Sequence, residues 1–93
     1  MSKSTKTTRK RVRFELHAET GSTVFVGGTF NNWDPKRSPL KEEQCGLFGA
    51  TLMLPKGTHE YKFVVNGEWR CDPNCPDWAP NSLGTLNSRM QVG

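Results

Sequence analysis

Two tryptophans lie in segments of this sequence that are typical of turns. Trp33 belongs to residues 30–35, where Asn, Asp and Pro favour local turn geometry over strand hydrogen bonding. Trp69 stands two residues after Asn66-Gly67, a strong signal for a tight hairpin. A large aromatic side chain on a turn is placed to meet a ligand, so the two indoles predict a stacking platform.

The polar residues near the tryptophans indicate what would stack there. An indole can lie against a nucleobase or against the C–H face of a pyranose ring, and the surrounding polar groups select between them. A groove for single-stranded nucleic acid carries several basic residues along its track. Here the mixture of amides, hydroxyls and one ammonium group suits a neutral sugar; its members are Lys62, Asn81, Ser82, Thr85 and Asn87.

The hairpin register places Lys62 beside one of the indoles. A two-residue turn at Asn66-Gly67 puts Trp69 opposite Val64, so Lys62 lies diagonal to the indole on the same face. A lysine is rarely buried unpaired, and this face is therefore expected to be wet. The opposite face then carries Tyr61, Phe63 and Val65.

Each residue also has an ordinary structural interpretation. A single Trp in a small β-domain usually packs in or beside the core. Trp78 can simply pin its own loop, most lysines are solvated, and Asn81 and Asn87 are common turn residues. The functional interpretation therefore depends on the whole set.

Short strands separated by turn signals predict an all-β fold. Residues 11–18 and 47–54 alternate between apolar and polar side chains, which is typical of half-buried strands. No amphipathic helix of useful length is present, so we expect a sandwich or barrel. Further strands are expected at residues 23–27, 59–65, around Trp69, at 86–92 and in a short edge segment from Leu40, with loops at 35–39 and 72–83.

The charge is divided unevenly along the chain of 93 residues, which is long enough for one domain. The net charge is +4, yet residues 14–93 carry seven Lys or Arg against nine Asp or Glu. We therefore expect a basic disordered tail at 1–10 and a module at 11–93, with no nucleic-acid partner. Neither a signal peptide nor an apolar run of membrane-spanning length is visible.

The three cysteines, Cys45, Cys71 and Cys75, are an odd number in a chain without an export signal. This favours free thiols in a reducing compartment, and we expect a cytoplasmic protein. Cys71 and Cys75 could form a local disulfide or half of a metal site, but a structural zinc site needs four ligands. Two plain loop cysteines, without metal or cofactor, are the expected outcome.

Catalysis finds little support in the residues. A glycosidase needs two carboxylates held across a cleft, and the acids here are scattered. Gly27-Gly28 stands between a strand and a turn, whereas a phosphate-binding glycine loop precedes a helix. We therefore expect a protein that is not an enzyme.

At this point the chain resembles a known family over roughly residues 12–92: the glycogen-binding domain of the AMP-activated protein kinase β subunit, within family 48 of carbohydrate-binding modules. The segments that carry the resemblance are Val24-Phe25-Val26-Gly27-Gly28-Thr29-Phe30-Asn31-Asn32-Trp33, residues 57–69 from Gly57 to Trp69, Asp72-Pro73, and Asn81-Ser82-Leu83-Gly84-Thr85-Leu86-Asn87. The resemblance implies an immunoglobulin-like β-sandwich that binds α-1,4-linked glucan, such as glycogen, starch or maltooligosaccharides, without catalysis.

The resemblance also implies a role for each matching site residue. Trp33 and Trp69 would stack on sugar rings, and Lys62 would donate hydrogen bonds to sugar hydroxyls. Leu83 would project from its loop against the glucan. Thr85 and Asn87 would bond hydroxyls or shape that loop.

Residues 71–78 depart from the family, because they contain two cysteines and a tryptophan. The kinase-anchoring segment expected after the domain in a β subunit does not follow, which favours a free-standing bacterial module. The alternative function is a protein-interaction sandwich that uses the exposed Trp patch and has lost sugar binding.

Overall fold

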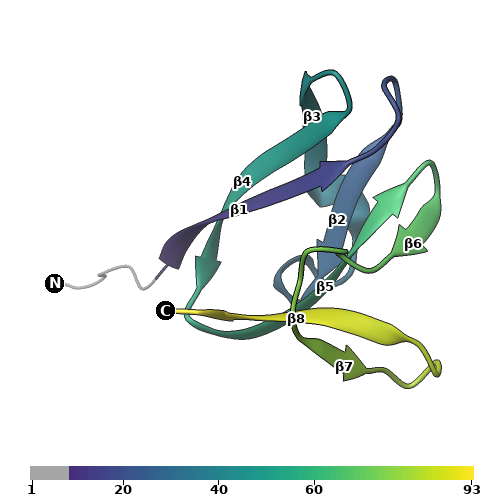
Figure 1. Ribbon diagram of the computed structural model, residues 1–93. Helices are drawn as coiled ribbons and strands as arrows, with labels where there is room; N and C mark the ends of the chain where they lie inside the picture. Colours follow the sequence, from purple (N-terminus) through teal and green to yellow (C-terminus); the bar gives the residue numbers. More distant parts are fainter. Residues whose placement is uncertain (1–8) are drawn as a thin grey trace, which may run out of the picture.

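The computed structural model describes residues 9–93, and these form an all-β structure (Figure 1). The helical segments among them are two short 3₁₀ turns, η1 Thr29–Asn31 and η2 Pro35–Arg37. The strands are β1 Arg9–His17, β2 Val24–Gly28, β3 Pro39–Gln44, β4 Leu47–Pro55, β5 Gly57–Val65, β6 Glu68–Arg70, β7 Trp78–Pro80 and β8 Leu86–Val92.

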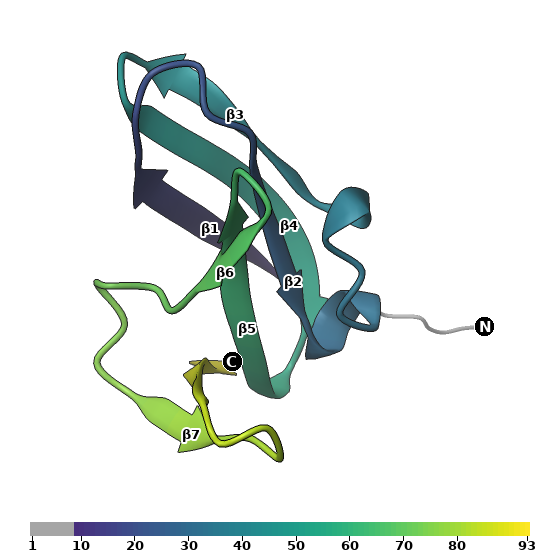
Figure 2. The same cartoon turned by 90° about the vertical axis from the view of Figure 1, so that its right-hand side faces the viewer.

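The strands make one antiparallel sheet that curls back on itself. Its order is β1-β4-β3-β2-β5-β8-β7, and β6 pairs with β5 beside β8. β3 is the corner, because its first residues pair with β2 and its later residues pair with β4. Figures 1 and 2 show β1 and β4 facing the layer that contains β2 and β5. This arrangement confirms the expected immunoglobulin-like sandwich.

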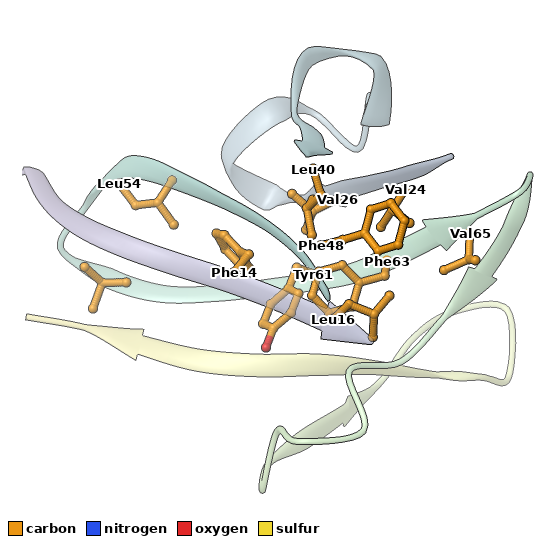
Figure 3. Packing of buried hydrophobic residues seen from close by; sticks show 11 residues of the cluster. Phe14, Leu16, Val24, Val26, Leu40, Phe48, Leu54, Tyr61, Phe63 and Val65 are labelled. Carbon is orange, nitrogen blue, oxygen red and sulfur yellow. The ribbon is translucent and has the colours of Figure 1, made fainter. Parts of the chain in front are cut away.

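The core lies between the two layers, and strand alternation explains its composition (Figure 3). β1 contributes Phe14 and Leu16, and β5 contributes Tyr61 and Phe63. The Phe14 and Tyr61 rings meet edge to face with centroids 5.2 Å apart, a favoured aromatic geometry. The remaining buried members are Val24, Val26, Leu40, Phe48, Leu54, Val65 and Val92.

The expected hairpin register is confirmed. Val65 pairs with Glu68 and Val64 pairs with Trp69, so Lys62 and Trp69 share the face opposite the core. That face is not exposed to solvent throughout, because Val64, the residue paired with Trp69, is buried on it.

Among the differences from the expected strands, two add pairing at the ends of the sheet order. β1 begins at Arg9, so the last two residues of the expected tail are already paired with β4, while residues 1–8 lie outside the described part. The expected loop at 72–83 contains β7, which pairs with β8. The sequence did not predict this strand, because Pro80 argues against strand pairing. Proline is tolerated there because β7 is an edge strand.

The expected loop at 35–39 also gains local structure. Asp34 caps η2 by accepting a hydrogen bond from the Lys36 backbone N–H at 3.2 Å. In residues 9–93 no helix is long and apolar enough to cross a membrane.

Candidate functional site

One open pocket of about 800 Å³ collects all six residues singled out by the resemblance. It lies on the outer face of the layer containing β2, β5 and β8, since its strand residues point away from the core. The lining residues are Thr29, Trp33, Glu60, Lys62, Trp69, Asn81, Ser82, Leu83, Thr85 and Asn87.

Trp33 reaches the pocket because the backbone before it turns sharply. Asn32 and Trp33 have φ values of 57° and 59°, a left-handed conformation that is unusual for residues other than glycine. The turn closes through a 2.9 Å hydrogen bond from the Trp33 N–H to the Gly28 carbonyl. Such a conformation persists only where surrounding contacts hold it.

Asn31 supplies those contacts from a buried position that sequence reasoning did not single out. Its Oδ1 accepts the Gly28 N–H at 2.9 Å, and its Nδ2 donates to the Val26 carbonyl and Ser38 Oγ, both at 3.0 Å. Since the amide bonds both ends of the segment, it fixes the turn that carries Trp33.

Trp69 extends from β6 across β5 toward β2, where Gly27 makes room for it. A Cβ built on Gly27 would lie 2.9 Å from the indole atoms Cη2 and Cζ3. The indole stays 46% exposed, and its ring centroid is 6.3 Å from that of Trp33 at an interplanar angle of 51°. The two rings therefore form a bent platform. Successive rings of an α-1,4-linked glucan turn relative to one another, so a bent platform suits them.

Lys62 stands beside the platform and is oriented by the loop that follows β7. Its Nζ donates to Thr85 Oγ1 at 3.0 Å, which leaves two ammonium hydrogens for a ligand. Leu83 is 86% exposed at the tip of that loop, the most open of the large apolar side chains described.

Asn81 organises the same loop, and its polar atoms are fully used in doing so. Its Oδ1 accepts the N–H groups of Leu83 at 2.9 Å and Thr85 at 3.1 Å. Its Nδ2 donates to Thr85 Oγ1 at 2.7 Å and to Asn87 Oδ1 at 3.0 Å. In this arrangement the Asn81 side chain positions its neighbours, because both amide hydrogens and both acceptor positions are in use. A direct bond from Asn81 to a sugar stays a prediction.

Glu60 and Thr29 are lining residues that sequence reasoning missed. Glu60 accepts the Asn87 Nδ2 hydrogen at 2.9 Å, and its backbone N–H donates to Thr29 Oγ1 at 3.3 Å. A signal for Glu60 was present, because it lies two residues before Lys62 and strand alternation puts both on one face.

Among the polar contacts that tie the loop behind the pocket to the sheet, two involve a shift in pKa. The Tyr61 hydroxyl donates to Asp72 Oδ2 at 2.7 Å, and burial, followed by this bond, raises the pKa of Tyr61 above its ordinary value. Arg89 donates from Nε and Nη2 to the two oxygens of Asp77 at 2.9 and 3.1 Å. Hydrogen bonding to Arg89 lowers the pKa of Asp77.

The cysteines stay outside the pocket. All three are free thiols. Cys71 donates to the Leu86 carbonyl, and the single thiol hydrogen of buried Cys75 lies between the carbonyls of Asp77 and Arg89. Among residues 9–93 no group of three or more His, Cys, Asp or Glu side chains is arranged to hold a metal ion.

Fold and pocket together define a class: a β-sandwich binding module whose exposed face suits a neutral ring rich in hydroxyls. Glu60 is the one carboxylate among the lining residues, whereas glycoside hydrolysis uses a pair.

Comparison with known proteins agrees with this class. Residues 11–93 match the family described as the glycogen recognition site of AMP-activated protein kinase, and the chain belongs to this family. The family is a carbohydrate-binding module, which is a non-catalytic kind of domain.

Several kinase subunits are similar to this chain. It is 43% identical over 75 residues to 5'-AMP-activated protein kinase subunit beta-2 of Mus musculus, covering 81% of this chain and 27% of that protein. It is 44% identical over 72 residues to subunit beta-1 of Rattus norvegicus, covering 77% of this chain and 25% of that protein. The chain thus spans about a quarter of the length of these relatives.

Proposed function

We propose that this chain binds α-1,4-linked glucan, such as glycogen, starch or maltooligosaccharides, without transforming it. The observation that carries the proposal is the pair of tilted indoles, half-buried Trp33 and exposed Trp69, which share one pocket with Lys62. Membership of the glycogen recognition family supports the same ligand class.

In this proposal each residue has a separate task. Trp33 and Trp69 stack on sugar rings, and Leu83 covers the glucan from the loop tip. Lys62 and Asn87 donate to sugar hydroxyls. Thr85 Oγ1 already accepts hydrogen bonds from Lys62 and Asn81, so its own hydrogen is directed to another acceptor.

Co-sedimentation tests the proposal most directly. The full chain is mixed with glycogen or amylose, and with an insoluble β-1,4-glucan as control. We expect pelleting with the α-glucans and none with the β-glucan, whose extended chain does not follow a bent platform. Absence of α-glucan binding would overturn the proposal.

We also propose that the chain has no hydrolytic or transfer activity. The lone pocket carboxylate, Glu60, cannot serve as both acid and nucleophile or base. Incubation with maltooligosaccharides should release no reducing ends. Release that is abolished by one Asp or Glu substitution would contradict this.

The alternative, a protein-interaction sandwich without sugar binding, gains no support from the pocket, whose polar groups surround the indoles. The matching relatives are named as subunits of a kinase, which supports a further protein partner for this chain as well. We place the protein in the cytoplasm, a proposal supported by its three free thiols.

A further inference from the structure

Glu60 presents a half-buried carboxylate in the pocket that forms no ion pair with any described residue. Its cross-strand neighbour is Arg89 on β8. The Arg89 guanidinium is turned to Asp77, with its bonds at 2.9 and 3.1 Å going to both oxygens of that carboxylate. The charge of Glu60 contributes to the raised pKa of Arg89, but the guanidinium makes its ion pair with Asp77 and not with Glu60.

One oxygen of Glu60 has a partner and the other does not. Oε1 accepts the Asn87 Nδ2 hydrogen at 2.9 Å, and no bond to Oε2 is found within residues 9–93. An ionised carboxylate accepts several hydrogen bonds, so Oε2 keeps its capacity to accept a further one at the open pocket. A ligand that brings a donor can use this oxygen.

The other lining groups mostly offer hydrogens. Lys62 retains two ammonium hydrogens, and Asn87 retains one amide hydrogen after its bond to Glu60. The Thr85 hydroxyl keeps its own hydrogen for another acceptor, because its oxygen accepts from Lys62 and Asn81. Both amide hydrogens of Asn81 are already donated. A sugar hydroxyl that accepts a hydrogen bond from one of these donors still has its own hydrogen to donate. The Glu60 carboxylate is the charged acceptor in the pocket for that hydrogen.

We propose that Glu60 contacts the bound glucan directly and sets its charge specificity. The carboxylate accepts a hydroxyl hydrogen from a glucose ring seated beside Lys62. It also repels a phosphate ester beside it and offsets the attraction of the Lys62 ammonium group, so the pocket binds anionic glucan less well than it would without this carboxylate. This inference rests on the proposed glucan binding.

The test measures a ratio of affinities. Dissociation constants are determined for neutral maltoheptaose and for a phosphate-esterified maltooligosaccharide of similar length, with the wild type and Glu60→Gln. Glutamine retains the volume and an oxygen for Asn87, but replaces the free acceptor by an amide and removes the charge. A purely structural disturbance would weaken both ligands alike, whereas a charge contact changes their ratio.

The matched control is Glu68→Gln. Glu68 precedes Trp69 on β6 but points to the opposite face, and its side chain is 72% exposed and paired with Arg70. The substitution therefore removes the same charge near the platform without touching the pocket.

We expect Glu60→Gln to shift the preference between the two glucans about 5-fold or more toward the phosphate-esterified one, since the lost repulsion acts at short range in a partly desolvated site. Glu68→Gln should leave the preference unchanged. The inference is overturned if Glu60→Gln keeps the wild-type ratio, or if both variants shift it equally. Failure of the wild type to bind maltoheptaose would instead refute the proposed function.

Discussion

At the scale of single residues, the pocket separates side chains that would touch a ligand from side chains that hold them in place. Trp33, Trp69 and Lys62 expose ring faces or hydrogens to the pocket. Asn31 and Asn81 also carry polar groups that could bind a sugar, but their side-chain amides are hydrogen-bonded to neighbouring residues of the protein. Residue type alone does not separate these roles; the count of unused donors and acceptors does.

The first prediction concerns the two platform tryptophans. Trp33→Ala and Trp69→Ala should each weaken glycogen binding about 5- to 150-fold, by analogy with the stacking of bases on aromatic side chains. Because both indoles lie outside the core cluster, the circular dichroism spectrum should be unchanged. Isothermal titration with maltoheptaose measures the loss.

Trp78→Ala is the control for this prediction. Trp78 is 47% exposed but does not line the pocket, so its removal should leave the affinity for maltoheptaose unchanged. An unfolded Trp33 or Trp69 variant would show that the indole in question belongs to the core.

At the scale of elements, close approach between strands decides where the platform lies. β2 and β5 pair so that Gly27 faces Lys62 and Gly28 faces Tyr61. The missing side chain of Gly27 gives the Trp69 indole its place, whereas Gly28 lies against backbone. Two neighbouring glycines therefore serve different purposes.

The second prediction compares these glycines. In Gly27→Ala the new Cβ meets the far end of a movable side chain, so the indole should shift, glucan affinity should fall and the melting temperature should change little. In Gly28→Ala the Cβ would lie 2.6 Å from the Glu60 carbonyl oxygen, which cannot move freely, and stability should fall. Thermal denaturation and titration of both variants check this; equal melting temperatures would contradict it.

The third prediction concerns the bond between β5 and the loop after β6. Burial, with the Asp72 hydrogen bond, raises the pKa of Tyr61 above its ordinary value of about 10. The unfolded chain therefore loses this proton at lower pH than the folded chain does. The associated stability is present below about pH 10 and is lost as pH rises further.

Tyr61 is the one tyrosine in the sequence, so phenolate absorbance reports on it alone. We expect no phenolate signal until the protein unfolds at alkaline pH. In Tyr61→Phe the alkaline loss of stability should be smaller. A phenolate signal near pH 10 in the folded protein would contradict the prediction.

At the scale of the whole molecule, most of the charged side chains lie outside the pocket. The described body carries its acids and bases mostly on the surface, and the pocket contains one of each, Glu60 and Lys62. A neutral glucan displaces no condensed counterions when it binds. Salt therefore distinguishes a sugar from a nucleic acid as the ligand.

The fourth prediction is a flat salt dependence. Affinity for glycogen should change little between about 50 and 200 mM salt, whereas a nucleic-acid complex with several phosphate contacts would lose on the order of 10³-fold or more. Co-sedimentation at both salt concentrations measures this. Deleting residues 1–8 should leave glycogen binding intact; loss of binding would assign the contact to the basic N-terminal residues.

Local patterns in the sequence were sufficient for most strands and for one edge of the site. Alternation marked β1 and β4, and Asn66-Gly67 predicted the pairing of Val64 with Trp69 and hence the side on which Lys62 lies. These features depend on residues close together in the chain, where periodicity and turn chemistry act directly. The family resemblance gave roles to Leu83, Thr85 and Asn87, and the structure brings them to the pocket, whereas Thr29 and Glu60 were not expected there.

Tertiary structure alone decided how the pocket is built. The 6.3 Å approach of the two indoles depends on the pairing of β2 with β5 and on the open space above Gly27. The bond that occupies one oxygen of Glu60 and leaves the other free comes from Asn87 of β8, 27 residues further along the chain. Such contacts join residues far apart in the chain, and no periodicity records them. Sequence therefore determined which residues could meet a sugar, and packing determined which of them are free to do so.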